Sequence, residues 1–331
     1  MHARVIVSAN EMQFIGSIVG LAVGDAMGYP AEFRRRSQLL AEIGPEGITE
    51  FIALKDARFS RPRFTGPDQP PGTFTDDTQM TIAVGESLLE AGHRELDQLM
   101  VEMSQRFVSW SCSDKNNRSP GGACMEGCSN LSRGVHWRDA GVAQTKGCGS
   151  AMRVAPIGLY YSDLDQVSTV ARASSLLTHG HDAAFAGAAA AALMVAMAAR
   201  GFGPEQIYRE IDARCCASSE DFSVAWRKVP ELLTISPDQV LVEGCLGEGW
   251  VAEEAVASAM YCFWRSPDDF KQAIYTAINS DGDSDSIGTI TGSVLGARLG
   301  VEAIPNRWRQ TVEDSQYLHE LGKRLWLNRR C

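Results

Sequence analysis

The chain has 331 residues, of which 44% are hydrophobic and 22% charged, with a formal net charge of −10. This is the composition of a globular protein with a sizeable core, so it excludes a disordered chain. A strongly acidic chain repels a polyanionic backbone, so we expect no nucleic-acid partner.

Two apolar segments could be mistaken for a signal peptide or a membrane span. Phe14 to Val23 is interrupted by two glycines and lacks a small-residue cleavage site, so it does not indicate a signal peptide. Ala183 to Ala199 is mostly alanine and falls short of the roughly 20 apolar residues that a membrane span needs. We therefore expect no membrane partner.

Cysteine usage indicates a reducing compartment. The chain has nine cysteines, an odd number, and no two of them have the C-x-x-C spacing of a structural zinc site. A chain of this length does not need disulfides for stability. We interpret the cysteines as reduced thiols and expect a cytoplasmic protein.

Helical spacing of apolar residues dominates the chain. The only hint of a strand is Val5 to Val7. The sequence therefore predicts an all-α fold, with residues 1–331 forming a single domain. Helices are predicted at Glu11–Met27, Thr78–Ala91, Leu96–Trp110, Leu164–Leu177, Ala183–Ala199, Pro204–Cys215, Gly249–Trp264, Pro267–Asn279 and Ile287–Leu299.

Two long loops lie between the predicted helices. Prolines and glycines over residues 62–72 mark the first, which also carries basic residues from Lys55 to Arg63. The second extends from Ser111 to Gly127 and is rich in Ser, Asn, Gly and Cys. Long ordered loops are often functional, although solvated connections are an equal alternative here.

Glycines recur every fourth residue in the first and last of the predicted helices, at positions 16, 20, 24 and 28 and at 288, 292, 296 and 300. This spacing leaves a smooth strip that permits the close approach of another helix. Asp25 lies in the first of these helices, where we expect it either to accept backbone N–H groups or to support the residues that contact a ligand. Glu32 follows that helix and, taken alone, is interpreted as a surface acid.

Acidic residues lie at the starts of two predicted helices. Asp76 and Asp77 are adjacent, with a threonine on either side. Capping of a helix by itself would explain one such acid, but two offer hard oxygen ligands suited to Mg²⁺ or Mn²⁺. Asp283 and Asp285 alternate with serines, and this segment lacks the remainder of a calcium loop. If the four acids share a pocket, their repulsion favours bound cations.

Two further segments are weak signals alone. Gly147 to Gly149 flank a cysteine in a loop that suits phosphate contact through backbone N–H groups, although an ordinary tight turn looks the same. His179 precedes the alanine-rich helix, and a lone histidine is more often structural than a ligand.

Taken together, these motifs resemble the ADP-ribosylglycohydrolase family, which includes dinitrogenase reductase-activating glycohydrolases and ADP-ribosyl-acceptor hydrolases. They occur in the family's order and span most of the chain. The matching segments are G-L-A-V-G-D-A-M-G at Gly20–Gly28 with Glu32, T-D-D-T at Thr75–Thr78, R-S-P-G at Arg118–Gly121, G-C-G-S-A-M-R-V-A-P at Gly147–Pro156, T-H at Thr178–His179 and G-D-S-D-S-I-G at Gly282–Gly288.

The resemblance implies a metal-dependent hydrolase that removes ADP-ribose from a modified protein, with arginine as the expected linkage. It implies Glu32, near the scissile bond, as a catalytic residue together with Asp77 and Asp283. It implies two Mg²⁺ or Mn²⁺ ions held by Thr75, Asp76, Asp77, Asp283, Asp285 and Ser286. Contacts with ADP-ribose are implied for Arg118, Gly121, Gly147, Cys148, Gly149, Ser150 and His179.

Two positions depart from the family pattern. Cys148 stands where the family usually has asparagine, which removes a side-chain amide from the glycine loop. Ser286 stands where threonine is common, and its hydroxyl retains the ability to bind a metal.

Three other functions remain open on the sequence alone. A protein that binds and blocks an ADP-ribosyltransferase would keep this fold, and the basic loop from Lys55 to Gly72 would be its contact. A two-metal phosphohydrolase acting on a nucleotide or on free ADP-ribose is the second alternative. A lens-type structural protein is a distant third.

Overall fold

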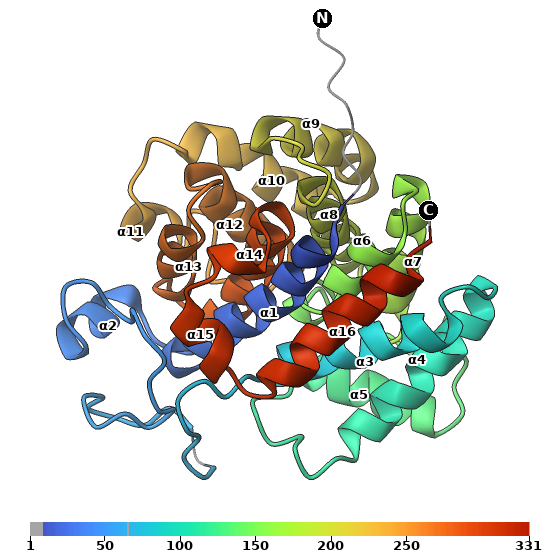
Figure 1. The fold of residues 1–331 in the computed structure, drawn as a ribbon, viewed down its shortest axis with the longest axis horizontal. Helices are drawn as coiled ribbons and strands as arrows, with labels where there is room; N and C mark the ends of the chain where they lie inside the picture. Colours follow the sequence, from blue (N-terminus) through green and yellow to red (C-terminus); the bar gives the residue numbers. More distant parts are fainter. Residues whose placement is uncertain (1–8, 65, 331) are drawn as a thin grey trace, which may run out of the picture.

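The computed structural model describes residues 9–64 and 66–330, and its architecture is all-α, as predicted (Figure 1). The α-helices are α1 (Glu11–Gly28), α2 (Arg36–Glu42), α3 (Asp76–Ala91), α4 (Leu96–Ser111), α5 (Gly122–Ser132), α6 (Ala155–Tyr160), α7 (Leu164–Leu176), α8 (Asp182–Ala198), α9 (Pro204–Cys215), α10 (Glu220–Leu232), α11 (Pro237–Val240), α12 (Ala252–Arg265), α13 (Phe270–Ile278), α14 (Ser284–Leu299), α15 (Asn306–Thr311) and α16 (Ser315–Asn328). The short elements are the 3₁₀ turns η1 (Tyr29–Ala31), η2 (Cys148–Ser150), η3 (Cys216–Ser218) and η4 (Val301–Ala303), and the strands β1 (Val142–Ala143) and β2 (His179–Gly180).

The nine predicted helices all occur, with ends that differ by a few residues at most. Side-chain caps fix several starts. Asn10 forms a capping box with Gln13 at the start of α1, and Thr75 accepts the N–H of Asp77 at the start of α3. Asp283 caps α14 by accepting the N–H of Ser286, so this helix begins earlier than its apolar pattern indicates.

The second predicted loop is wrong in its last part. Helix α5 begins at Gly122, inside the segment that was expected to be irregular up to Gly127. Glycines in this helix hid its start, since glycine has low helix propensity. The predicted strand at Val5 to Val7 lies outside the described residues.

Two central helices pack unusually closely. Helices α1 and α14 run antiparallel, and their glycine strips face each other (Figure 1). A Cβ atom added at Gly24 would lie 2.0 Å from the Gly288 carbonyl oxygen, and one added at Gly28 would lie 2.4 Å from the Cα of Asp285. The predicted close approach is therefore real, and the two strips are each other's partner. This glycine seam ends beside an acidic residue.

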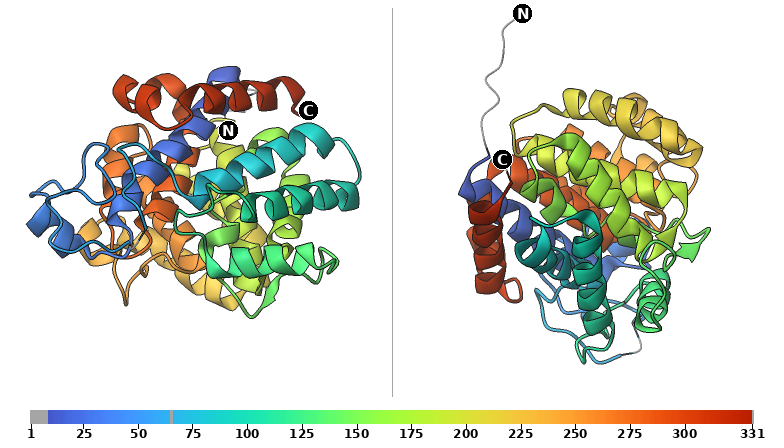
Figure 2. Two further views of the ribbon diagram at one scale, coloured as in Figure 1. Left: turned by 90° about the horizontal axis from the view of Figure 1, so that it is seen from below. Right: turned by 90° about the vertical axis from the view of Figure 1, so that its right-hand side faces the viewer.

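Around the seam, the remaining helices build a buried core. Helix α16 lies along α1 at the surface, while α8 packs against α7, α12 and α14 (Figures 1 and 2). Helix α8 is buried on nearly all sides, because its alanines allow neighbours to approach from every direction. The segment Glu11–Ala31 is long and apolar enough to cross a membrane, yet its most apolar 18-residue window is wholly buried inside the protein.

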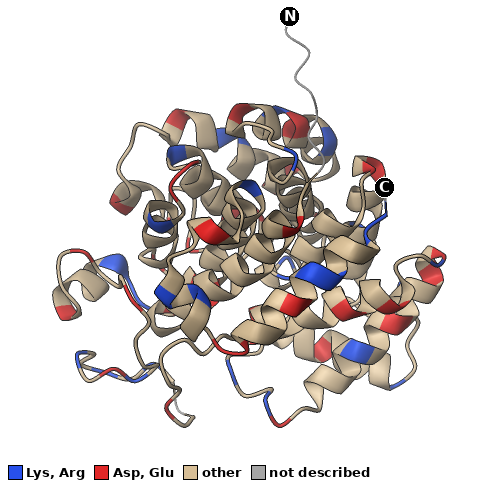
Figure 3. Ribbon diagram, viewed as in Figure 1, with Lys and Arg blue, Asp and Glu red and all other residues tan. Residues whose placement is uncertain are grey.

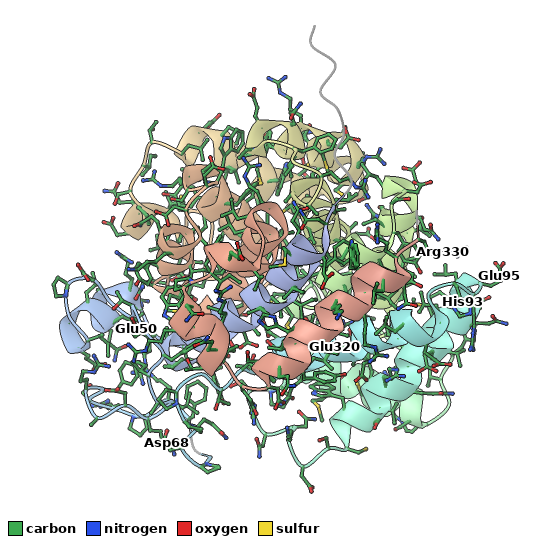
Figure 4. The ribbon with its side chains drawn as sticks, in the orientation of Figure 1. Glu50, Asp68, His93, Glu95, Glu320 and Arg330 are labelled. Atoms are coloured by element: carbon green, nitrogen blue, oxygen red, sulfur yellow. The ribbon has the colours of Figure 1, made fainter. Side chains whose placement is uncertain are left out.

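The periphery is polar. Basic positions recur along the extended segment that follows α2 (Figure 3), where Arg58 pairs with Asp56. Glu50 and Asp68 project at this edge, whereas His93, Glu95 and Arg330 project at the opposite edge (Figure 4), where they border one shallow hollow.

Candidate functional site

One cavity of about 390 Å³ gathers most of the residues singled out in the sequence. Its walls come from the end of η1, the starts of α3, α5 and α14, the turn η2, strand β2 and the segment before α12. Predicted site residues that line it are Glu32, Asp76, Asp77, Gly121, Gly147, Cys148, Gly149, His179, Asp283, Asp285 and Ser286.

Three predicted residues do not line this cavity. Thr75 is fully buried and uses its hydroxyl to cap α3. Ser150 donates its hydroxyl to the Ala184 carbonyl oxygen at 3.3 Å. Arg118 pairs with Glu313 and donates to the Phe74 carbonyl oxygen at 3.0 Å.

Arg118 nevertheless supports the cavity through its backbone. Its carbonyl oxygen accepts the N–H of Asp76 at 3.3 Å, and the nearby Gly121 N–H donates to Asp76 Oδ2 at 3.2 Å. The loop before α5 is therefore tied to the acidic start of α3, and the Arg118–Glu313 pair holds that loop against the C-terminal part of the chain.

The acidic residues occupy the floor of the cavity and are almost completely buried. Burial raises the pKa of Asp76, Asp77 and Asp285 well above the ordinary value of 3.8, and neighbouring carboxylates raise it further. Burial and the charges of Asp283 and Asp76 do the same for Glu32. Repulsion among gathered acids, expected from the sequence, is thus present.

Several of these carboxylate oxygens have no hydrogen-bond partner. Buried and unpartnered are Asp77 Oδ2, Asp285 Oδ1 and Glu32 Oε2. Buried polar atoms are normally satisfied, so an unsatisfied cluster of oxygens lining one cavity indicates a ligand that carries positive charge or donates hydrogen bonds.

Asp25 contributes from behind the floor. It is fully buried in α1 and accepts the N–H groups of Thr75 at 2.9 Å and Thr78 at 3.0 Å, together with the Thr78 hydroxyl. Burial raises its pKa to about 6, and the hydrogen bonds lower it in part. Of the two roles weighed in the sequence, the structure supports that of an N–H acceptor, one that anchors the start of α3.

The thiol of Cys148 points into the acidic floor. Its Sγ donates to Asp283 Oδ2 at 2.9 Å and lies 3.5 Å from Ser286 Oγ. Burial raises the pKa of this thiol well above 9.0, and the charge of Asp283 adds to the effect. Cys148 is therefore a neutral hydrogen-bond donor to the acidic floor.

His179 forms one wall through a chain of buried polar groups. Arg153 donates to Thr178 Oγ1 at 2.8 Å, and that hydroxyl lies 2.8 Å from His179 Nδ1. Burial, with help from the Arg153 charge, lowers the pKa of His179 to about 3, so the ring is neutral at pH 7. The Nε2 atom of the ring lies beside Gly147 and Gly149.

Sequence reasoning missed an aromatic pair at the cavity. Phe33 and Trp250 both line it and stack with ring centroids 5.0 Å apart. Phe33 directly follows Glu32, which could have drawn attention to it. Trp250 follows Gly249, which has a φ of +83°. A lone Gly-Trp pair in a sequence does not indicate a binding site.

Comparisons with known proteins identify the relatives of this chain. The family model described as ADP-ribosylglycohydrolase matches residues 8–331. An uncharacterized protein of Archaeoglobus fulgidus is 33% identical over 317 residues, covering 96% of each chain. The ADP-ribosylhydrolase ARH3 of Gallus gallus is 29% identical, with 95% of this chain and 92% of the relative covered.

Two other similarities complete the comparison. The ADP-ribosylarginine hydrolase Tri1 of Serratia proteamaculans is 23% identical over 94% of this chain and 78% of its own. A solved structure described as an ADP-ribosylglycohydrolase-related protein complex superimposes with a TM-score of 0.75 and 26% identity, covering 96% of this chain and 98% of the other.

Proposed function

Since the chain belongs to the ADP-ribosylglycohydrolase family, we propose that it removes ADP-ribose from modified arginine side chains of a protein, using two divalent cations. The observation that carries the proposal is the set of unpartnered carboxylate oxygens on the floor of one cavity. The name of the Serratia relative, an ADP-ribosylarginine hydrolase, supports the choice of linkage.

The donor set fits Mg²⁺ or Mn²⁺. Both ions prefer oxygen ligands, and the floor offers four aspartate carboxylates and the Ser286 hydroxyl. Within the described residues, no three His, Cys, Asp or Glu side chains are already positioned as a metal site. Hydroxyl ligands complete the set. The ligands we propose are Thr75, Asp76, Asp77, Asp283, Asp285 and Ser286.

When bound, the two cations would supply Lewis-acid chemistry, by holding ribose hydroxyls and by acidifying a water molecule. The protein's own groups have complementary roles. As the bond at the anomeric carbon breaks, positive charge develops there, and the buried carboxylates of Asp77 and Asp283 stabilise it.

Glu32 is positioned for proton transfer. Burial and the charges of Asp283 and Asp76 raise the pKa of its carboxyl group well above the ordinary value of 4.5, and one of its oxygens has no partner. A protonated acid at this position donates its proton to the departing nitrogen of arginine, or the carboxylate orients the attacking water.

The opposite wall binds the remainder of the substrate. Gly147 and Gly149 have no side chains to obstruct a diphosphate, and His179 Nε2 lies beside them, where the Nε2–H tautomer would donate a hydrogen bond. Neutral donors are sufficient here because the cations would balance much of the negative charge of the ligand.

A release assay tests this function. The purified protein is mixed with arginine-ADP-ribosylated protein in Mg²⁺ or Mn²⁺, and parallel reactions contain EDTA. We expect metal-dependent release of intact ADP-ribose. Released phosphate would indicate a phosphohydrolase instead, and absence of release together with tight binding to an ADP-ribosyltransferase would indicate a blocking protein.

A further inference from the structure

We infer that the Phe33–Trp250 pair is a platform for the guanidinium group of the arginine that leaves, and that it selects arginine-linked over serine-linked substrates. This inference rests on the proposed function and assigns a specificity role to two residues at its site. Both rings line the cavity, and they come from different parts of the chain.

Phe33 is held in an unusual conformation. Its φ is +63°, a value that disfavours a bulky side chain, and its side chain is 48% exposed. Its N–H donates to the Gly282 carbonyl oxygen at 3.0 Å, which fixes the backbone beside the acidic segment before α14. Phe33 also meets Phe64 edge-on, with ring centroids 5.9 Å apart, yet it remains exposed, and strained residues gather where ligands bind.

Trp250 is fixed from two sides. Its indole N–H donates to Glu248 Oε2 at 3.2 Å, and its carbonyl oxygen accepts the N–H of Cys148 at 3.1 Å. A hydrogen bond to a carboxylate makes the indole ring richer in electrons and increases its attraction for a cation. These hydrogen bonds therefore hold the indole ring in place and favour its contact with a cation.

The position of the pair indicates which part of the substrate it meets. Phe33 is adjacent in the chain to Glu32, the group proposed to act at the scissile bond, and it lies at an exposed edge of the cavity whose acidic floor is buried. The ribose is assigned to that floor, so the group across the bond faces outward toward the rings.

The chemistry of the rings fits a guanidinium group. Guanidinium is planar and cationic, stacks on aromatic faces and is weakly hydrated, whereas a serine linkage offers no cation. The net charge of −10 and the acidic floor also attract a cation to this opening. Arginine-linked substrate therefore gains a contact that the serine-linked form lacks.

The test compares Phe33→Leu and Trp250→Leu with the wild type on two peptides, one ADP-ribosylated on arginine and one on serine. Affinity for free ADP-ribose is measured by calorimetry in parallel. Trp250→Phe is the matched control, since it keeps an aromatic face at the same position.

We expect each leucine variant to lose about five- to thirty-fold in kcat/KM on the arginine peptide, chiefly through KM, as the loss of a cation–π contact predicts. Serine-peptide turnover and ADP-ribose affinity should stay within about twofold, and Trp250→Phe should retain most activity.

Three results would overturn the inference. If affinity for ADP-ribose falls by the same factor as turnover, the rings stack on the nucleobase. If both peptides lose activity equally, the rings do not select the linkage. If the wild type binds ADP-ribose yet does not favour the arginine peptide, only the inference about the Phe33–Trp250 pair fails. A wild type that neither binds nor releases ADP-ribose refutes the proposed function, and the inference falls with it.

Discussion

The glycine seam between α1 and α14 and the acidic cavity at its end are both buried, yet they are stabilised in opposite ways. Along the seam, the atoms nearest to the facing glycines are mostly backbone atoms of the opposite helix. In the cavity, buried carboxylates raise one another's pKa, and three of their oxygens have no partner.

The difference separates stability from function within one helix pair. The seam fixes where Asp285 lies, because Gly28 contacts its backbone directly. The cavity then holds charges in an arrangement that costs free energy until a ligand neutralises them. The close packing of the glycine seam stabilises the fold, so the protein tolerates the unfavourable electrostatics of the acidic cavity.

The largest expected effect concerns activity. Asp77→Ala and Asp283→Ala should each lower kcat by about 100- to 1,000-fold, since each removes a charge that stabilises the transition state. The fold should persist, because the seam is untouched. ADP-ribose release and circular dichroism provide the measurements.

Asp268→Ala is the matched control for this prediction. Its side chain is 75% exposed and pairs with Arg298 at the surface, so activity should be unchanged. Full activity in both cavity variants would show that these acids do not take part in the reaction.

A change in the seam should act on stability. Gly24→Ala places a Cβ atom 2.0 Å from a backbone oxygen, so α1 and α14 must separate. We expect a loss of about 3 kcal/mol in the free energy of unfolding, measured in urea. Gly122→Ala, where the added atom meets nothing within 4 Å, should be neutral. Equal stability of the two variants would mean that the seam is not tightly packed.

Bound metal ions should offset the free-energy cost of the buried carboxylates in the cavity. At a concentration 100-fold above Kd, Mg²⁺ or Mn²⁺ should stabilise the wild type by about 2.7 kcal/mol, seen as a rise in Tm that EDTA reverses. Asp77→Asn should raise the Tm of the metal-free protein, because it removes a repelling buried acid, and should reduce the metal-induced rise. A variant that loses stability without metal and keeps the full metal response would contradict this explanation.

A smaller effect should follow acidification. The pKa of His179 lies at about 3 in the folded protein, below the ordinary value of 6.5, so folding disfavours its protonation. Its contribution to stability is present above pH 6.5 and is lost as the pH falls below that value, reaching about 2 kcal/mol by pH 5.

Urea denaturation at pH 7 and pH 5 measures this loss. His179→Gln should show about 2 kcal/mol less pH dependence than the wild type. His136→Gln, which changes an exposed histidine, should match the wild type. If His179→Gln and the wild type respond alike, the ring is not held neutral by burial.

The sequence predicted the fold class and most cavity residues for identifiable reasons. Apolar spacing marks helices such as α4 directly, and the paired acids at the starts of α3 and α14 indicate a site because helix capping alone does not need two of them. The glycine strips predicted close packing, although nothing in the sequence said that the two strips are each other's partner.

Other features were beyond sequence reasoning. Arg118 looked like a ligand contact, but only the folded chain brings Glu313 against it. Phe33 and Trp250 are far apart in sequence, and their stacking depends on a positive φ and on tertiary contacts that no periodicity encodes. Helix α5 was missed in part because its glycines favour loops locally, whereas packing decides the outcome.

We propose that the unpartnered carboxylates of the cavity bind a pair of divalent cations. Equilibrium dialysis with Mn²⁺, followed by electron paramagnetic resonance, tests it most directly, with the Asp77→Asn/Asp285→Asn double variant as comparison. We expect about two Mn²⁺ ions per wild-type chain, magnetically coupled, and a loss of binding in the folded double variant. A folded wild-type protein that binds no Mn²⁺, or a double variant that binds as much as the wild type, would contradict it.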